Sequence, residues 1–308
     1  MIHVENLTKR FSQTLAVDSL SLDVAEGEVF GFLGPNGAGK TTTVRMLTSL
    51  IAPTSGTATI GGTATIGGFT LGKQDTNIRR TVGVLTETPG MYDNLTAEYN
   101  LRIFGELYEV EDVSGQIEKY LKMLGLWERR FDAAGTFSKG MKQKLAIARA
   151  LLHEPRILFL DEPTAGLDPE GAHLVREFIA ELKKEGRTIF LCTHNLDEAD
   201  HLCDRVGVFK TRLLVVDTPT RLRASVFGRK VIFHLRAADE AMADDIRKLP
   251  FVREVKVVEN KLVVTLDEPE ARNPEVVRAL VKAGADIQFV GELRHSLEDV
   301  YLQLVKDA

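Results

Sequence analysis

The sequence predicts a large α/β domain with a helical insertion, followed by a smaller α+β domain. Three apolar runs of strand length, at Val29–Leu33, Ile157–Leu160 and Thr188–Leu191, show no polar alternation. Such runs are typical of strands covered on both faces of a parallel or mixed sheet. The first run leads through a glycine-rich segment into a helical pattern, and after Thr218 the pattern changes to short strands and helices. Strands that alternate with helices indicate the α/β class.

The composition is that of an ordinary globular chain. It has 308 residues, of which 44% are hydrophobic, and a formal net charge of −5; an acidic chain argues against a nucleic-acid binder, which usually carries a basic face. No run approaches the roughly 20 apolar residues of a membrane-spanning helix, and the start MIHVENLTKRF lacks the features of a signal peptide. Cys192 and Cys203 fit a reducing compartment and are expected to be small apolar residues. We therefore expect a cytoplasmic chain whose work at a membrane needs partners.

A phosphate-binding loop is predicted directly after the first apolar run. The segment Gly34–Thr41 reads GPNGAGKT, matches GxxxxGK[ST] and is followed by a helical pattern at 42–50. Glycines let backbone N–H groups wrap a phosphate, and the following helix points its positive end at the same anion. Lys40 is expected to reach the β- and γ-phosphates of a nucleoside triphosphate, and the Thr41 hydroxyl is expected to bind Mg²⁺. The expected nucleotide contacts in this loop are Gly34, Pro35, Asn36, Gly37, Ala38, Gly39, Lys40, Thr41 and Thr42.

Two adjacent carboxylates, Asp161 and Glu162, end the second apolar run. Neighbouring side chains of a strand point to opposite faces, so both acids can serve one site only if the chain turns there, and Pro163 favours a turn. Asp161 is expected to organise Mg²⁺ and its waters, and Glu162 is expected to polarise the attacking water. Alone, this pair could be no more than an acidic turn. Beside a phosphate loop it predicts hydrolysis of a triphosphate.

A third motif lies between these two. The segment Phe137–Gln143 reads FSKGMKQ and is followed by helical spacing at 145–152. Ser138 is a good N-cap residue, so the segment is expected to begin a helix whose exposed N–H groups can hold a phosphate. The segment resembles the signature sequence of ABC ATPases, usually Leu-Ser-Gly-Gly-Gln, and lies at the family's position between the other two motifs. Ser138 and Gly140, which in the family would touch the ATP of a second subunit, match that pattern. The departures from it are Phe137, Lys139 and Met141.

Further segments follow in the order of that family. Pro163–Asp168 resembles the loop through which two subunits signal to each other, and His194 resembles the switch histidine that hydrogen-bonds the γ-phosphate. Phe11 stands where the family carries an aromatic residue stacked on adenine. The family usually presents a glutamine to Mg²⁺ before the helical insertion, and Glu87 stands there in this chain. A carboxylate is still a metal ligand, although it adds negative charge beside a triphosphate.

The resemblance implies a P-loop ATPase that binds ATP and Mg²⁺ and closes as a homodimer around two ATP molecules. Lys40, Glu162 and His194 would be its catalytic residues, and Thr41, Asp161 and Glu87 its metal-binding residues. Such a chain would power transport through a separate integral membrane permease, peripheral on the inner face of the cell membrane and without nucleic acid. The alternatives are a soluble ABC ATPase that acts on nucleic acid or ribosomes, and a nucleotide-binding scaffold. A phosphate-release assay would test the second of these.

The remaining chain predicts a second domain. After residue 218 the pattern is strand, helix, strand, strand, helix, strand, which is the ferredoxin-like βαββαβ order, and a final helix follows. The second of the two helices inside this order is expected at Pro274–Lys282. This part and the ending SLEDVYL, at 296–302, resemble type-2 export ATPases of the daunorubicin-type drug-export group. The expected parts are therefore an ATPase domain at 1–218 with a helical subdomain at about 88–140, a linker at 219–228 and an accessory domain at 229–308.

One local feature has no motif assigned to it. Thr-Ala-Thr-Ile-Gly-Gly occurs twice in succession at 57–68. β-Branched residues suit a strand and Gly-Gly suits a turn. We expect a tolerated insertion at a strand end.

Overall fold

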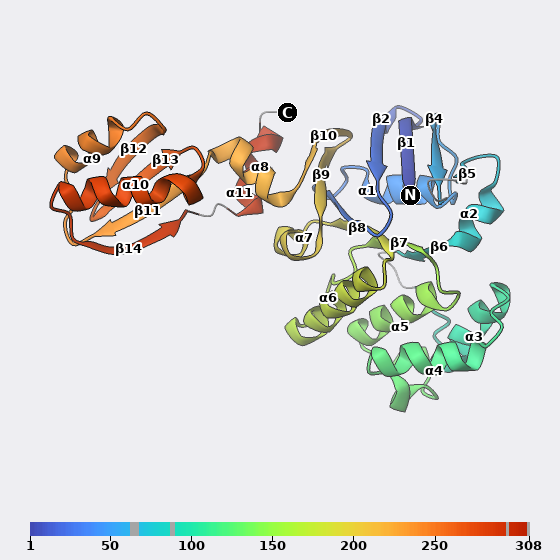
Figure 1. Ribbon diagram of the computed structural model, residues 1–308. Helices are drawn as coiled ribbons and strands as arrows, with labels where there is room; N and C mark the ends of the chain where they lie inside the picture. The colour runs from blue at the N-terminus through green and yellow to red at the C-terminus, as the bar shows by residue number, and fades with distance from the viewer. Residues whose placement is uncertain (62–67, 87–89, 294–295, 307–308) are drawn as a thin grey trace. The chain divides into compact units, whose positions relative to one another are not determined.

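The computed structural model describes residues 1–61, 68–86, 90–293 and 296–306. It contains two compact units, Met1–Thr218 and Pro219–Ala308 (Figure 1). Among the described residues, none of the helices combines the length and the hydropathy needed to cross a bilayer.

The first unit is built on a six-stranded sheet. The strand order is β10-β9-β3-β8-β7-β6, in which β9, β3, β8, β7 and β6 run parallel and β10 antiparallel. The three apolar runs form its centre, and their residues are buried on both faces, as the sequence predicts. Phe32 packs against Phe190 and Phe209 with ring centroids 5.2 and 4.5 Å apart. The strands are β3 (Val29–Leu33), β6 (Val82–Leu85), β7 (Ile157–Asp161), β8 (Thr188–Thr193), β9 (Arg205–Lys210) and β10 (Arg212–Asp217).

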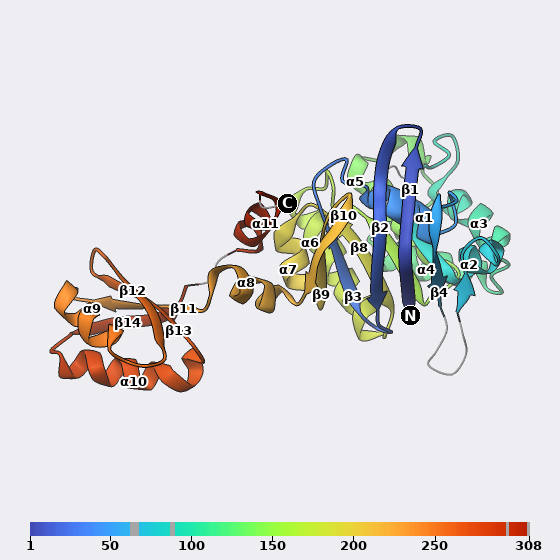
Figure 2. The ribbon, with the colours of Figure 1, turned by 90° about the horizontal axis from the view of Figure 1, so that it is seen from above.

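A second, antiparallel sheet completes the core of this unit. Its order is β2-β1-β4-β5, and Figure 2 shows β2, β1 and β4 side by side. The bounds are β1 (Ile2–Phe11), β2 (Thr14–Val24), β4 (Ser55–Ile60) and β5 (Phe69–Thr70). The first copy of the duplicated Thr-Ala-Thr-Ile lies in β4, whereas residues 62–67, which include most of the second copy, lie outside the described residues.

Helices pack against these sheets. Their bounds are α1 (Lys40–Leu47), α2 (Asp75–Thr81), α3 (Ala97–Leu107), α4 (Val113–Met123), α5 (Lys139–Leu151), α6 (Pro169–Lys184) and α7 (Leu196–Leu202). In Figure 1, α3, α4 and α5 lie together as one helical group. Helix α5 ends at Leu151, in agreement with the helical spacing expected at 145–152.

Helix α3 shows that helical spacing alone does not identify the buried face. Tyr99 and Leu107 follow the apolar spacing but are exposed, whereas Asn100 is fully buried. The Asn100 amide donates to the carbonyl oxygens of Tyr92 and Leu95 at 3.1 and 3.2 Å, and its oxygen accepts from the Tyr92 N–H at 2.8 Å. These bonds make burial of the amide tolerable and fix the loop before α3.

The second unit has the predicted βαββαβ order. Its sheet is antiparallel, in the order β12-β13-β11-β14, with Val231 and Phe233 of β11 buried against Ile246 of α9 and Leu280 of α10. The bounds are α8 (Pro219–Phe227), β11 (Lys230–Leu235), α9 (Glu240–Arg247), β12 (Val252–Val258), β13 (Lys261–Leu266), α10 (Pro269–Lys282), β14 (Ile287–Glu292) and α11 (Leu297–Lys306).

Two segments of this unit differ from expectation. Residues 219–228, expected to be a linker, contain helix α8, because Pro219 is well suited to the first position of a helix. The buried Leu222 lies in α8, which packs against α11. Helix α10 was expected from Pro274 but begins at Pro269, so Pro274 lies inside it.

Candidate nucleotide site

The phosphate loop joins β3 to α1 and depends on two of its glycines. Gly39 precedes α1 with φ 105°, a conformation that favours glycine, and a Cβ there would overlap the Ala16 carbonyl oxygen. Gly34 adopts no unusual φ, but a Cβ there would overlap the Phe209 carbonyl oxygen. The backbone of the loop is therefore packed closely against β2 and β9.

Lys40 is the first residue of α1 and is 6% exposed. Its Nζ donates to the Gly34 carbonyl oxygen at 2.7 Å and lies 3.6 Å from Glu162 Oε1. A buried ammonium group needs such partners. The lysine is thus folded over the loop, with its charge at the place where a bound phosphate would be held.

Asp161 and Thr41 meet across the site. The Thr41 hydroxyl donates to Asp161 Oδ2 at 2.6 Å, and Asp161 is 1% exposed at the end of β7. Among the described residues, no group of three or more His, Cys, Asp or Glu side chains could hold a metal ion. Mg²⁺ is usually held by one or two carboxylates together with phosphate oxygens. One carboxylate beside one hydroxyl fits that requirement.

Glu162 turns the chain out of β7. It has a positive φ of 54°, unusual for a residue other than glycine, and its N–H donates to the Cys192 carbonyl oxygen at 2.9 Å. The Glu162 carboxylate lies between Lys40 and His194, whose Nδ1 is 2.8 Å from Glu162 Oε2. The turn therefore brings the carboxylates of Asp161 and Glu162 to the same site, as expected from the sequence.

These groups line a cavity of about 360 Å³. Of the predicted residues, the cavity is lined by Pro35, Asn36, Gly37, Gly39, Lys40, Thr41, Thr42, Asp161 and Glu162. Ala16 of β2 also lines it, which no motif indicated. Gly34 and Ala38 support the loop from behind: Gly34 accepts from Lys40, and the Ala38 N–H donates to the Pro35 carbonyl oxygen at 3.2 Å.

The other predicted residues lie around this cavity or apart from it. Phe11 does not line it; it is 47% exposed at the end of β1, with the Lys9 ammonium 5.0 Å from its ring centroid. His194 is exposed and reaches the cavity only through Glu162. Glu87 lies outside the described residues, so its predicted role at the metal stays a prediction.

The signature segment forms an open helix end. Ser138 is the N-cap of α5, and its side chain accepts from the Met141 N–H at 3.2 Å. Ser138 is exposed, Gly140 is half-buried, and neither lines the cavity around Lys40. In a single chain, therefore, the predicted signature contacts are separate from the predicted phosphate loop contacts.

Two buried polar residues near the site were not predicted. Gln143 of α5 is 4% exposed and bonds to the backbone that follows Asp161. Glu198 of α7 is 1% exposed; burial raises its pKa, and the hydroxyls of Thr193 and Thr164 oppose that rise. A polar residue among helical apolar positions was the only available signal in either case.

Comparison with known proteins covers both units. Residues 17–165 match the family model described as ABC transporter, and residues 218–305 match the C-terminal domain of DrrA1-3-like ATP-binding proteins. The chain is 36% identical to the bacitracin transport ATP-binding protein BcrA of Bacillus licheniformis, over 99% of this chain and 97% of the relative. It is 33% identical to the linearmycin resistance ATP-binding protein LnrL of Bacillus subtilis, over 91% and 89%.

Solved structures agree with these relatives. An ATP-binding subunit of an ABC transporter is 30% identical with a TM-score of 0.66, covering 74% of this chain and 94% of that one. A dimeric ATP-binding cassette in a post-hydrolysis state with ADP and Pi is 26% identical with a TM-score of 0.64, covering 71% and 98%.

Proposed function

This chain belongs to the ABC transporter family as an ATP-binding, ATP-hydrolysing subunit related to those of export systems, and from that premise we propose that it drives export by closing as a dimer around ATP. The observation that carries the proposal is the division of the site. Lys40 and Glu162 line one cavity, whereas Ser138 is exposed at the open end of α5 and does not line it. A second copy would supply the missing contacts.

The chemistry follows from the groups that line the cavity. The phosphate loop N–H groups and Lys40 bind the phosphates of ATP, and the Thr41 hydroxyl and Asp161 are the groups that would hold Mg²⁺. Bound Mg²⁺ would supply charge neutralisation at the β- and γ-phosphates. Glu162 accepts a proton from the attacking water, and His194, within hydrogen-bond distance of that carboxylate, orients it.

The proposed direction is export, through separate membrane-spanning subunits at the inner face of the membrane. The relatives are named for bacitracin transport, linearmycin resistance and fluoroquinolone export, and the second unit matches the C-terminal domain of DrrA1-3-like proteins. Cargo would be selected by the membrane subunits. The rival proposal of a ribosome or nucleic-acid partner has no support from the chain's net charge of −5.

The surface proposed to grip the membrane subunit lies before α3. Tyr92 is 53% exposed and Leu95 is half-buried. Their loop is held by the buried Asn100 amide, which bonds to the backbone of both residues. An exposed aromatic ring on a fixed loop is a frequent interface anchor.

The experiment is affinity purification of the tagged chain from detergent-solubilised membranes of its own cells. We expect it to capture a polytopic membrane protein. Tyr92→Ala should lower that capture while basal ATP hydrolysis is kept, because Tyr92 does not line the cavity. Tyr99→Ala, which removes a similarly exposed tyrosine from α3 itself, is the matched control. Capture of ribosomes or nucleic acid in place of a membrane protein would contradict the proposal.

A further inference from the structure

Gln143 is a buried polar side chain that the chemistry described above does not use. It lies on α5, five positions after Ser138, and is 4% exposed. Its Nε2 donates to the Pro163 carbonyl oxygen at 3.1 Å and lies 3.4 Å from the Glu162 carbonyl oxygen. Both acceptors belong to the backbone turn that presents the Glu162 carboxylate to the cavity.

That turn needs to be fixed from outside. A non-glycine residue at positive φ, as Glu162 is with φ 54°, is strained and persists only when its surroundings determine it. The Cys192 carbonyl oxygen, which lies in β8, accepts a hydrogen bond from the Glu162 N–H. Pro163 has no N–H to contribute, so its carbonyl oxygen is its only backbone hydrogen-bonding group, and Gln143 binds that oxygen.

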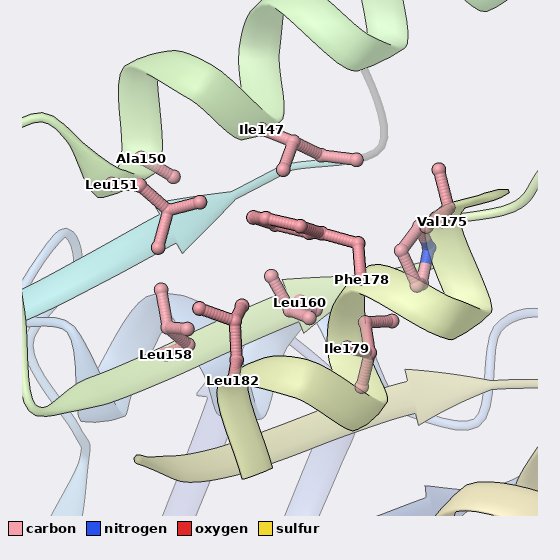
Figure 3. Close-up of a pocket in the computed structure, with 10 residues that line it drawn as sticks. Ile147, Ala150, Leu151, Leu158, Leu160, Val175, Phe178, Ile179 and Leu182 are labelled. Atoms are coloured by element: carbon pink, nitrogen blue, oxygen red, sulfur yellow. The ribbon is translucent and has the colours of Figure 1, made fainter. Parts of the chain in front are cut away.

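The remainder of α5 is attached to the same strand by apolar contacts. Ile147 and Leu151 of α5 and Phe178 of α6 line a small apolar pocket over Leu158 and Leu160 of β7, as Figure 3 shows. Pro163 lines this pocket as well. The turn is thus held on one side by apolar packing and on the other by the Gln143 amide.

The first turn of α5 touches the loop that follows. The side chain of Lys139 lies over Gly166, where a Cβ would overlap its Nζ and Cε, and a Cβ on Gly140 would come within 3.3 Å of Leu167 Cδ2. Lys139, Gly140 and Gln143 therefore lie beside Gly166, Leu167 and Pro163, respectively. An α-helix is stiff over the roughly 7–8 Å that separates Ser138 from Gln143.

We propose that Gln143 is a positioning residue that ties the signature end of α5 to the turn carrying Glu162. Helix α5 and residues 162–167 then move as one body when Ser138 meets the nucleotide held by a second copy. ATP bound at one site then influences Glu162 of the neighbouring site through the Gln143 side chain, which connects the two within a single chain. This inference rests on the proposed dimer and adds to it a path between the two sites.

The test is Gln143→Met, which keeps the length of the side chain and removes the donor. Because a misplacement of about 1 Å can cost ~10²-fold in rate, we expect kcat for ATP hydrolysis to fall by roughly 10- to 10²-fold. The KM for ATP and the thermal unfolding midpoint should stay near those of the parent. Lys142→Met, one position earlier on α5, removes the pair with Asp93 and is the matched control, with parental kcat expected.

A second variant tests the positioning role through the pH dependence of kcat, which would not change if Gln143 only supported the fold. Gln143→Glu places a carboxylate against two carbonyl oxygens, and only its protonated form can donate to them. The kcat of this variant relative to the parent should therefore rise as pH is lowered, when both are measured at a temperature at which both proteins are fully folded.

The outcomes separate this inference from the proposed function. A parental kcat in Gln143→Met overturns the inference and leaves the proposed function standing. A loss of kcat that is matched by loss of ATP binding and of thermal stability also overturns it, because the residue would then support the fold. If the dimer of the parent chain hydrolyses no ATP, both this inference and the proposed function are wrong.

Discussion

Among single residues, Glu162 combines an unusual backbone conformation with a carboxylate placed between Lys40 and His194. The sequence predicted the acid and the need for a turn, because Asp161 and Glu162 are adjacent at a strand end. It could not predict the Glu162–His194 contact, because a histidine 32 positions away reaches this carboxylate only through the parallel pairing of β7 and β8. The hydrogen bond of Gln143 could not be predicted because it depends on the packing of α5 against the turn after β7.

Glu162→Gln tests the catalytic assignment. The amide has the shape of the carboxylate but cannot accept the proton of the attacking water, so we expect phosphate release to fall by ~10²–10⁴-fold. Binding of ATP, measured with a fluorescent analogue, should be kept because the phosphate loop is untouched. Glu177→Gln, on the exposed side of α6, is the control and should match the parent. Near-parental hydrolysis in Glu162→Gln would assign the base to another group.

At the scale of elements, the sequence predicted the central strands of the six-stranded sheet. The structure differs from the prediction where tertiary contacts determine which residues are buried or helical. Strands β3, β7 and β8 were evident because residues buried on both faces must be apolar. The buried face of α3 was not evident, because a polar Asn100 occupies it and satisfies its amide with backbone groups of one loop. Helix α8 was not predicted because Pro219 was interpreted as the end of the regular pattern, whereas it is the first residue of the helix.

An ion-pair cluster braces α4 against the sheet. Lys119 of α4 lies 2.6 Å from Glu154 Oε1, and Arg187, directly before β8, binds the other carboxylate oxygen. Burial alone would raise the pKa of Glu154, but the hydrogen bonds from Lys119 and Arg187 lower it to about 2. Since the ordinary value is 4.5, the ionised group stabilises the fold fully above that pH, and the contribution is lost as pH falls through about 2.

Glu154→Gln should therefore lower the thermal unfolding midpoint more at neutral pH than near pH 3, where the parent has begun to lose the same contribution. The measurement is thermal unfolding of parent and variant at several pH values. Glu118→Gln, which removes an exposed pair with Lys122 on the same helix, should change the midpoint little at any pH. A midpoint difference for Glu154→Gln that stays constant with pH would show that the pair contributes no charge-dependent stability.

For the whole molecule, the proposed function depends on a site to which two chains contribute. The first unit has the fold of an ABC cassette and the second the ferredoxin-like order, and both were predictable because each strand and helix has its own local pattern. The resemblance to ABC ATPases predicts that Ser138 and Gly140 of one copy touch the ATP bound by another copy. The exposed position of Ser138 and its separation from the cavity around Lys40 support that proposal.

Disulfide trapping between two differently tagged populations, both carrying Glu162→Gln, tests the shared site most directly. One population carries Ser138→Cys and the other Asn36→Cys. The native Cys192 and Cys203 are buried, and burial raises the pKa of both thiols, so they should not compete. A disulfide requires Cα atoms within about 7 Å. We expect a mixed-tag species of twice the chain mass that forms with ATP, and none from either population alone. Absence of that species in the presence of bound ATP would contradict a nucleotide shared between the phosphate loop of one copy and the signature helix of another.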